Sequence, residues 1–127
     1  MQLSRRGLLG SAAALSTVPL VRARGQAKPT IKLGVLTDGG LPFAKRTPEA
    51  DEINFAPRVK IPVLMVNGRY DFIFPLETSQ APLFRLLGTL PKDKRHVVLD
   101  SAHDILSRPE TVREILDWLD RYFGPVK

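Results

Sequence analysis

Two runs of apolar residues stand out in the second half of the chain, and each predicts a β-strand. Residues 61–66 are all apolar and end at the turn-forming pair Asn67-Gly68, and a second run covers residues 96–99. Continuous apolar runs of this length are typical of strands buried on both faces, as parallel strands are. We therefore expect two parallel strands here.

Apolar residues at three-and-four spacing predict a helix after each strand. The clearer helix begins at Pro109 and ends at Gly124-Pro125, and its apolar positions are Val112, Ile115, Leu116, Leu119 and Phe123. A weaker pattern over residues 79–87 ends at Gly88. The order strand–helix–strand–helix implies a right-handed parallel crossover, so the fold class is α/β.

A further strand is predicted near the N-terminus, where residues 31–36 alternate and then stop at a turn over residues 37–40. Residues 31–40 are similar to the opening strand of periplasmic substrate-binding proteins that capture amino acids. The similarity ends at Gly40. It implies an alternative function for the chain, as an exported binding or interaction module such as a degenerate substrate-binding protein.

Residues 1–27 have the layout of an export signal. Arg5 and Arg6 precede a short apolar stretch, and the Ser-Arg-Arg-x-Leu-Leu order beginning at Ser4 resembles a twin-arginine signal. The stretch is shorter than the about 20 residues that a membrane-spanning helix needs, so we expect no stable membrane span. A genuine signal predicts a periplasmic or exported protein; a disordered basic N-terminus would leave it cytoplasmic. We expect three parts: the signal at 1–27, a leader with a short strand at 28–40, and the main segment at 41–127.

The charge of the chain does not indicate a nucleic-acid binder. Its net charge is +6, but without Arg5, Arg6, Arg22 and Arg24 there are 15 basic residues against 13 acidic ones. The remaining basic residues form no stripe and are not interleaved with aromatic residues. The chain has no cysteine, which excludes disulfides, thiolate metal sites and a cysteine nucleophile.

The candidate chemistry lies just beyond the two predicted strands. Asp71 follows the first strand by five residues and His103 follows the second by four. If the strands are neighbours, both loops open at the same edge of the sheet and the two side chains can meet. A carboxylate bound to one ring nitrogen leaves the other free to act as a base. Taken singly, such an aspartate is usually a turn former and such a histidine is usually structural.

The order Asp then His on consecutive βα units is the order that α/β-hydrolases use after their serine. Residues 41–126 resemble the C-terminal end of an α/β-hydrolase of the dienelactone hydrolase and prolyl-oligopeptidase-like group, through residues 61–71, residues 96–103 and the closing helix at 116–122. The resemblance implies an incomplete α/β-hydrolase fold of two C-terminal βα units, with the N-terminal strand as an extra one. It also implies that Asp71 is the acid and His103 the base of a catalytic triad.

The nucleophile of that family does not match any position here. The family places its serine in Gly-x-Ser-x-Gly, and none of the six serines has glycine two places before and after it. We therefore expect a truncated or split serine-hydrolase-like protein that is inactive alone. A gene fragment, a binding module and half of a split enzyme all stay open. The partner would be a nucleophile-bearing hydrolase half or a second copy of the chain.

Three other side chains compete for a role. Asp100 and Asp104 flank the histidine loop as alternative partners of His103, with loop caps as the safer interpretation, and His96 is expected at a surface or an edge. The two histidines lie far apart without a carboxylate cluster at ligand spacing, so no metal site and no cofactor are predicted. With only two or three strands and open sheet edges, we expect a marginal fold or one that needs a partner.

Overall fold

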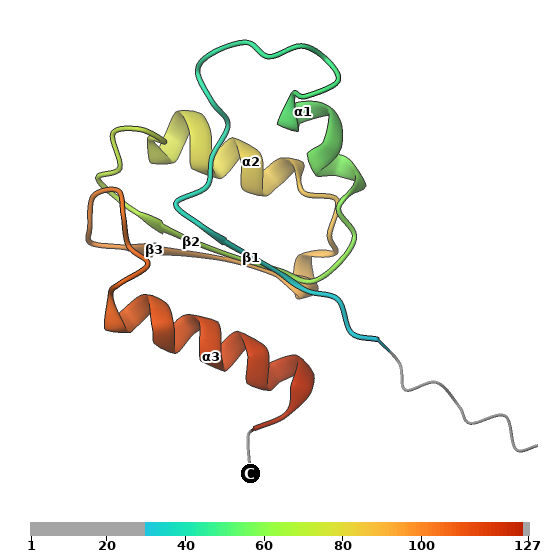
Figure 1. Cartoon of the computed structure of the whole chain (residues 1–127), viewed down its shortest axis with the longest axis vertical. Helices are drawn as coiled ribbons and strands as arrows, with labels where there is room; N and C mark the ends of the chain where they lie inside the picture. Colours follow the sequence, from blue (N-terminus) through green and yellow to red (C-terminus); the bar gives the residue numbers. More distant parts are fainter. Residues whose placement is uncertain (1–29, 126–127) are drawn as a thin grey trace, which may run out of the picture.

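The computed structural model describes residues 30–125, so the predicted export signal lies outside the described residues. Three strands form one parallel sheet in the order β1-β2-β3 (Figure 1). They are β1 (Gly34–Thr37), β2 (Val63–Gly68) and β3 (Lys94–Leu99). The expected α/β class, with two βα units and an extra N-terminal strand, is confirmed.

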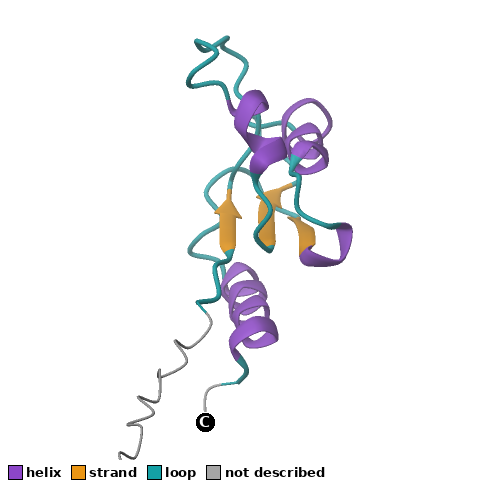
Figure 2. Cartoon of the chain, turned by 90° about the vertical axis from the view of Figure 1, so that its right-hand side faces the viewer, coloured by secondary structure: helices purple, strands orange, loops and turns teal. Residues whose placement is uncertain are grey.

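The sheet is covered by helices on both faces. Helices α1 (Glu52–Phe55) and α2 (Ala81–Leu86) lie on one face, and the longer helix α3 (Pro109–Phe123) lies on the other (Figures 1 and 2). All six residues of β2 are buried, which explains its continuous apolar run. Its side chains alternate between two core clusters, because successive residues of a strand point to opposite faces.

Each core cluster joins one face of β2 to the helices above it. Val63 and Met65 pack with Leu83 and Leu87 of the α2 segment. On the other face, the cluster consists of Leu64, Val66, Ile105 and Trp118. The central strand and the two helical layers therefore form one packed unit.

The elements match the sequence pattern but differ at their ends. Strand β2 continues through Asn67 and Gly68, because these residues pair with Val98 and Leu99 of β3. Strand β3 begins at Lys94, two residues before its apolar run. A π-helical turn at Leu76–Gln80 precedes α2, and short 3-10 turns lie at Ala56–Arg58 and Pro91–Asp93.

Helix α3 buries only part of the apolar face that the spacing predicted, since Ile115 packs against the core cluster of Trp118 but other predicted positions do not. Its buried residues are Thr111 and Trp118, while Val112, Leu116 and Phe123 are about half exposed. The helix therefore has an outward apolar stripe besides its packed face. Sequence spacing could not separate the two, because Trp118 and the outward residues are all apolar.

Strand β1 belongs to the same sheet as the two strands of the hydrolase-like segment. Gly34 to Thr37 pair in parallel with Val63 to Val66, one residue for one. The strand expected in the 28–40 leader is thus part of this sheet, and the boundary at Gly40 stays a prediction. Among residues 30–125, none of the helices is long and apolar enough to cross a membrane.

Candidate active site

Asp71 lies in the loop after β2 and its carboxylate is fully buried. One oxygen, Oδ1, accepts hydrogen bonds from the backbone N–H groups of Ile73 at 2.8 Å and Phe74 at 3.0 Å. The buried Gln80 fixes both ends of this loop, because its Nε2 donates to the carbonyl oxygens of Gly68 and Phe74, each at 2.8 Å. The orientation of the carboxylate is therefore set by the backbone around it.

His103 lies in the loop after β3, and its ring contacts the buried carboxylate. Its Nδ1 lies 2.8 Å from Oδ2 of Asp71, and its side chain is 31% exposed. The ring of Phe74 lies beside it, with centroids 6.1 Å apart. The structure thus brings together the two residues that the sequence predicted, and leaves one side of the imidazole open to solvent.

Backbone contacts between the two loops explain why these side chains meet. The N–H of Arg69 donates to the carbonyl of Leu99 at 2.8 Å, and that of Tyr70 donates to the carbonyl of Ser101 at 2.9 Å. Gly68 lies so close to the histidine loop that a Cβ there would clash with the carbonyl of Ala102. The loop after β2 and the loop after β3 are therefore packed against each other.

The environment of Asp71 keeps its carboxylate ionised. Burial alone would raise the pKa of Asp71, but hydrogen bonds from the Phe74 N–H, the His103 ring and the Ile73 N–H outweigh it. The net result is a pKa below the ordinary value of 3.8. An ionised carboxylate can only accept hydrogen bonds, so the Nδ1 of His103 carries the proton between them.

The environment of His103 makes it a stronger base. The hydrogen bond to Asp71 raises the pKa of His103 above the ordinary 6.5; partial burial opposes this, and the charges of Asp71, Asp38 and Asp104 add to it. With Nδ1 donating to Asp71, the Nε2 of the neutral ring is the nitrogen that can accept a proton. A carboxylate and an imidazole in this arrangement can perform general base catalysis.

Asp38 is a third ionisable residue at the site, and the sequence pattern placed it in a turn after the first strand. It follows β1, and its Oδ2 accepts a hydrogen bond from the N–H of Ile105 at 3.0 Å. The rule that selected Asp71 and His103, a polar residue just past a parallel strand, also selects Asp38. The signal was missed because the first strand was assigned to the separate 28–40 leader.

Three residues of this site have the atoms to hold a metal ion. Asp38, Asp71 and His103 each offer one ligating atom, and these atoms lie within 4.8 Å of one another. Carboxylate oxygens and imidazole nitrogens are zinc ligands, but an ion held by all three would have to replace the Asp71–His103 hydrogen bond. Ligand spacing along the sequence does not indicate such a cluster, because its members lie on three separate segments.

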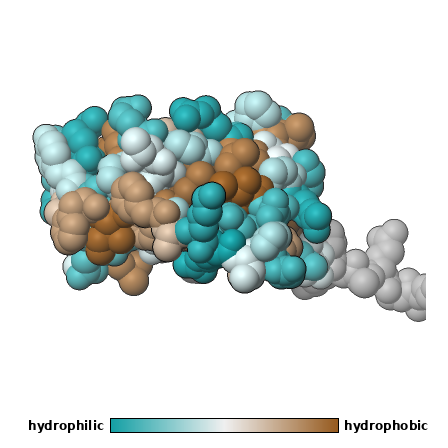
Figure 3. Space-filling model, turned by 90° about the horizontal axis from the view of Figure 1, so that it is seen from above, coloured by the Kyte–Doolittle hydropathy of each residue, from teal (hydrophilic) through white to brown (hydrophobic). Residues whose placement is uncertain are grey.

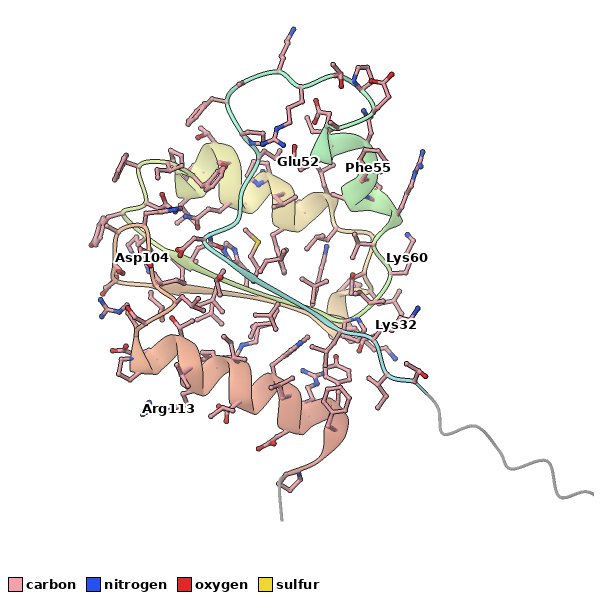
Figure 4. The ribbon with its side chains drawn as sticks, in the orientation of Figure 1. Lys32, Glu52, Phe55, Lys60, Asp104 and Arg113 are labelled. Atoms are coloured by element: carbon pink, nitrogen blue, oxygen red, sulfur yellow. The ribbon has the colours of Figure 1, made fainter. Side chains whose placement is uncertain are left out.

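The other residues considered from the sequence have different partners. Asp100 pairs with Arg69 at 3.0 Å, and both side chains are largely exposed. Asp104 is exposed in the loop between β3 and α3 (Figure 4). His96 lies on the edge strand β3, as one of the two expectations had it, and is partly buried there. Its Nε2 lies 3.1 Å from Oδ1 of Asn67, and burial lowers its pKa.

The described residues include three serines, Ser79, Ser101 and Ser107, and the first two have structural partners. The hydroxyl of the buried Ser79 donates to the carbonyl of Leu41 at 2.7 Å. The hydroxyl of Ser101 accepts a 3.4 Å hydrogen bond from Arg108. Neither contact connects a serine hydroxyl to His103.

Comparison with known proteins shows the class of fold. No protein-family model and no curated protein sequence matches the chain. Solved structures of a novel cold-adapted esterase from an Arctic intertidal metagenomic library are similar to it, with 27% identity and a TM-score of 0.57. The match covers 72% of this chain, so the molecule has a hydrolase-related partial α/β fold similar to that of an esterase.

The esterase is known in native, zinc-bound and PEG-bound forms. The match covers 38% of the native and zinc-bound chains and 36% of the PEG-bound chain. The chain therefore spans well under half the length of the esterase it resembles. Its three parallel strands and helices are consistent with an incomplete α/β-hydrolase fold.

Proposed function

We propose that this chain supplies the acid and the base of a serine-hydrolase-type site that hydrolyses esters. The observation that carries the proposal is the 2.8 Å contact between His103 Nδ1 and Asp71 Oδ2, at the carboxyl ends of adjacent parallel strands. Functional groups of open α/β sheets gather at this edge. The similarity of the fold to an esterase supports ester hydrolysis as the reaction.

In the proposed reaction, the Nε2 of His103 takes the proton from a serine hydroxyl as that oxygen attacks the ester carbonyl. The resulting imidazolium is stabilised by the buried Asp71 carboxylate, which stays ionised. His103 then returns the proton to the alcohol as it leaves. A water molecule, activated by the same nitrogen, releases the acid in a second cycle.

The serine of the proposed reaction comes from a segment outside these 127 residues, in the same or in another polypeptide. No serine here has the Gly-x-Ser-x-Gly surroundings. Loss of the nucleophile of a triad costs about a millionfold in turnover. We therefore infer that the 127 residues alone hydrolyse esters at close to the uncatalysed rate.

The free edge of β1 supports the docking of such a segment. Within residues 30–125 the sheet order is β1-β2-β3, so the outer edge of β1 has no strand beside it. A hollow of 260 Å³ lies next to it, lined by Leu36 of β1, Phe55 of α1, and Leu83 of α2, among others. We call it the β1 hollow. Apolar residues are exposed on the face that α1 and α2 form, seen from above in Figure 3, and Phe55 lies on α1 beside α2 (Figure 4).

The experiment is a complementation assay. The full chain is mixed with a polypeptide that carries the nucleophile-bearing N-terminal part of the similar esterase, and hydrolysis of p-nitrophenyl butyrate is measured. We expect activity only in the mixture. The variant His103→Ala should abolish it, and Asp71→Asn should lower it by about 10⁴-fold, as loss of the triad acid does elsewhere.

Two outcomes would contradict the proposal. Activity in the mixture that survives His103→Ala would show that the base lies elsewhere. Activity of the chain alone that is lost on His103→Ala would show that the nucleophile lies within these 127 residues. The matched control is His96→Gln, since His96 is bonded to Asn67 and should leave the activity of the mixture unchanged.

A further inference from the structure

Asp38 has a positive φ angle and a carboxylate oxygen that is buried without a hydrogen-bond partner among the described residues. Its φ is +53°, in the left-handed region that residues other than glycine seldom adopt. In the described part of the chain, the other non-glycine residue with positive φ is Asp104, which directly follows His103. Strained backbone of this kind is concentrated at functional sites, where the surrounding structure maintains it.

The contacts of Asp38 explain what maintains its conformation. Its N–H donates to the carbonyl of Val66 at 3.0 Å, which continues the pairing of β1 with β2. Its Oδ2 accepts from the N–H of Ile105 at 3.0 Å, across 67 residues of sequence. Ile105 is fully buried and lies two residues after His103. Asp38 therefore connects the end of β1 to the loop that carries the histidine.

The other carboxylate oxygen of Asp38, Oδ1, indicates how its charge is used. Oδ1 is buried and has no hydrogen-bond partner among the described residues. One carboxylate oxygen of Asp38 lies within 4.8 Å of a carboxylate oxygen of Asp71 and a ring nitrogen of His103. A buried carboxylate oxygen without a partner is costly, unless a positive charge close by compensates for it.

We propose that Asp38 is a positioning residue of the site: it holds the His103 loop through the Ile105 N–H and places a second negative charge beside the imidazolium that forms during the reaction. This rests on the proposed role of His103 as the base. Asp71 orients the ring through a direct hydrogen bond, whereas Asp38 acts through the loop and through its charge.

The charged groups around His103 come from three segments, and they differ in their exposure to water. Asp71 follows β2, Asp38 follows β1, and Asp104 belongs to the histidine loop itself. Asp104 is exposed, so water screens its charge more effectively than that of the partly buried Asp38. Removing the Asp38 charge should therefore affect His103 more than removing the Asp104 charge.

The test is a pH titration of the histidine ring resonances by NMR, on the full chain. The chain has two histidines, so each resonance can be assigned by one substitution. The variant Asp38→Asn removes the charge but keeps an oxygen for the Ile105 N–H, and asparagine tolerates the left-handed conformation. We expect the pKa of His103 to fall in Asp38→Asn, and to fall further than in the matched control Asp104→Asn.

A second variant tests the positioning of the loop. Asp38→Ala removes the acceptor of the Ile105 N–H, so hydrogen exchange at that amide should accelerate by about tenfold or more, as expected for the loss of a hydrogen bond to a charged group. In Asp38→Asn the exchange should stay near that of the unmodified chain. The titration of His96, which burial keeps below its ordinary pKa, reports whether each variant is folded.

The outcomes separate this inference from the proposed function. If Asp38→Asn leaves the His103 titration unchanged, or shifts it no more than Asp104→Asn, Asp38 has no role at the base. Unchanged Ile105 exchange in a folded Asp38→Ala would overturn the positioning role. If Asp71→Asn fails to lower the pKa of His103, the Asp71–His103 pair itself is wrong, and the proposed function fails with it.

Discussion

At the scale of single residues, Asp71 and His103 each stabilise the charged form of the other. Asp71 has a lowered pKa in the folded chain, so its contribution to stability is present above its ordinary 3.8 and is lost as the pH falls through the lower folded pKa. His103 has a raised pKa, so its contribution is complete below its ordinary 6.5 and is lost as the pH rises through the higher folded pKa.

The stabilisation from this pair should therefore have a limited pH window. We expect the free energy of unfolding of the unmodified chain to exceed that of His103→Gln most clearly between pH 3.8 and 6.5. The difference should shrink on either side of that window. Urea unfolding at a series of pH values measures it. The control Asp100→Asn removes one partner of an exposed ion pair and should change stability little.

Strand-end position explains which site residues the sequence could predict. Asp71 and His103 each follow a clear apolar run, so the parallel-sheet rule placed them at one edge. Asp38 obeys the same rule, but its strand is short and partly exposed, with a weaker pattern. The sequence also favoured Asp71 over Asp100 and Asp104 as the partner of His103, through the order Asp then His on consecutive βα units, and the 2.8 Å contact agrees with that choice.

At the scale of elements, the site depends on the close packing of the loop after β2 against the loop after β3. The variant Gly68→Ala introduces a Cβ that meets backbone carbonyls of Ser101 and Ala102, which cannot move like a flexible side chain. We expect it to destabilise the fold by about 1–3 kcal/mol and to move the pKa of His103 back toward its ordinary value.

Thermal unfolding and the histidine titration measure the two effects of Gly68→Ala. The matched control is Gly39→Ala, in the turn after β1. There the added Cβ meets one neighbour, the Cβ of Leu36, at an ordinary 3.7 Å. A neutral Gly68→Ala with an unchanged His103 titration would show that the two loops are not held together as the structure indicates.

Strand β2 is the element on which the packing of both faces depends. Leu64 is completely buried and packs between the sheet and α3. Leu64→Ala should cost about 2–5 kcal/mol, since it leaves a cavity as well as losing buried apolar surface. Ile53→Ala on α1, where the side chain is 49% exposed, should cost less than about 1 kcal/mol. Equal effects in chemical denaturation would contradict this arrangement of the core.

At the scale of the whole molecule, apolar surface is exposed in several places along the described residues, and two of them concern a docking partner. One is the β1 hollow beside the free edge of β1, and the other is the outward stripe of α3 formed by Val112, Leu116 and Phe123. A three-stranded sheet with open edges has a small core for the number of residues that it orders. A partner that covers such surface should therefore stabilise the chain.

The complementation partner provides a direct test of the docking surface. Phe55→Asp places a charge in the β1 hollow and should weaken the binding of the nucleophile-bearing polypeptide by about tenfold or more, because burial of one large apolar side chain contributes about 1.5–3 kcal/mol. Isothermal titration calorimetry measures the affinity. The control Leu90→Asp alters a residue that is 60% exposed outside the hollow. Equal weakening by both variants would place the partner elsewhere.

The amino-acid sequence by itself determined the α/β class, the two βα units, and the Asp71–His103 pair. These follow from local patterns, because apolar runs define buried parallel strands and such strands present their ends at one edge. Only the tertiary structure decided that β1 pairs with β2 and in which register, that α3 packs through Thr111 and Trp118, and that Asp38 lies beside His103. These depend on contacts between segments far apart in the chain, which spacing along the sequence does not record.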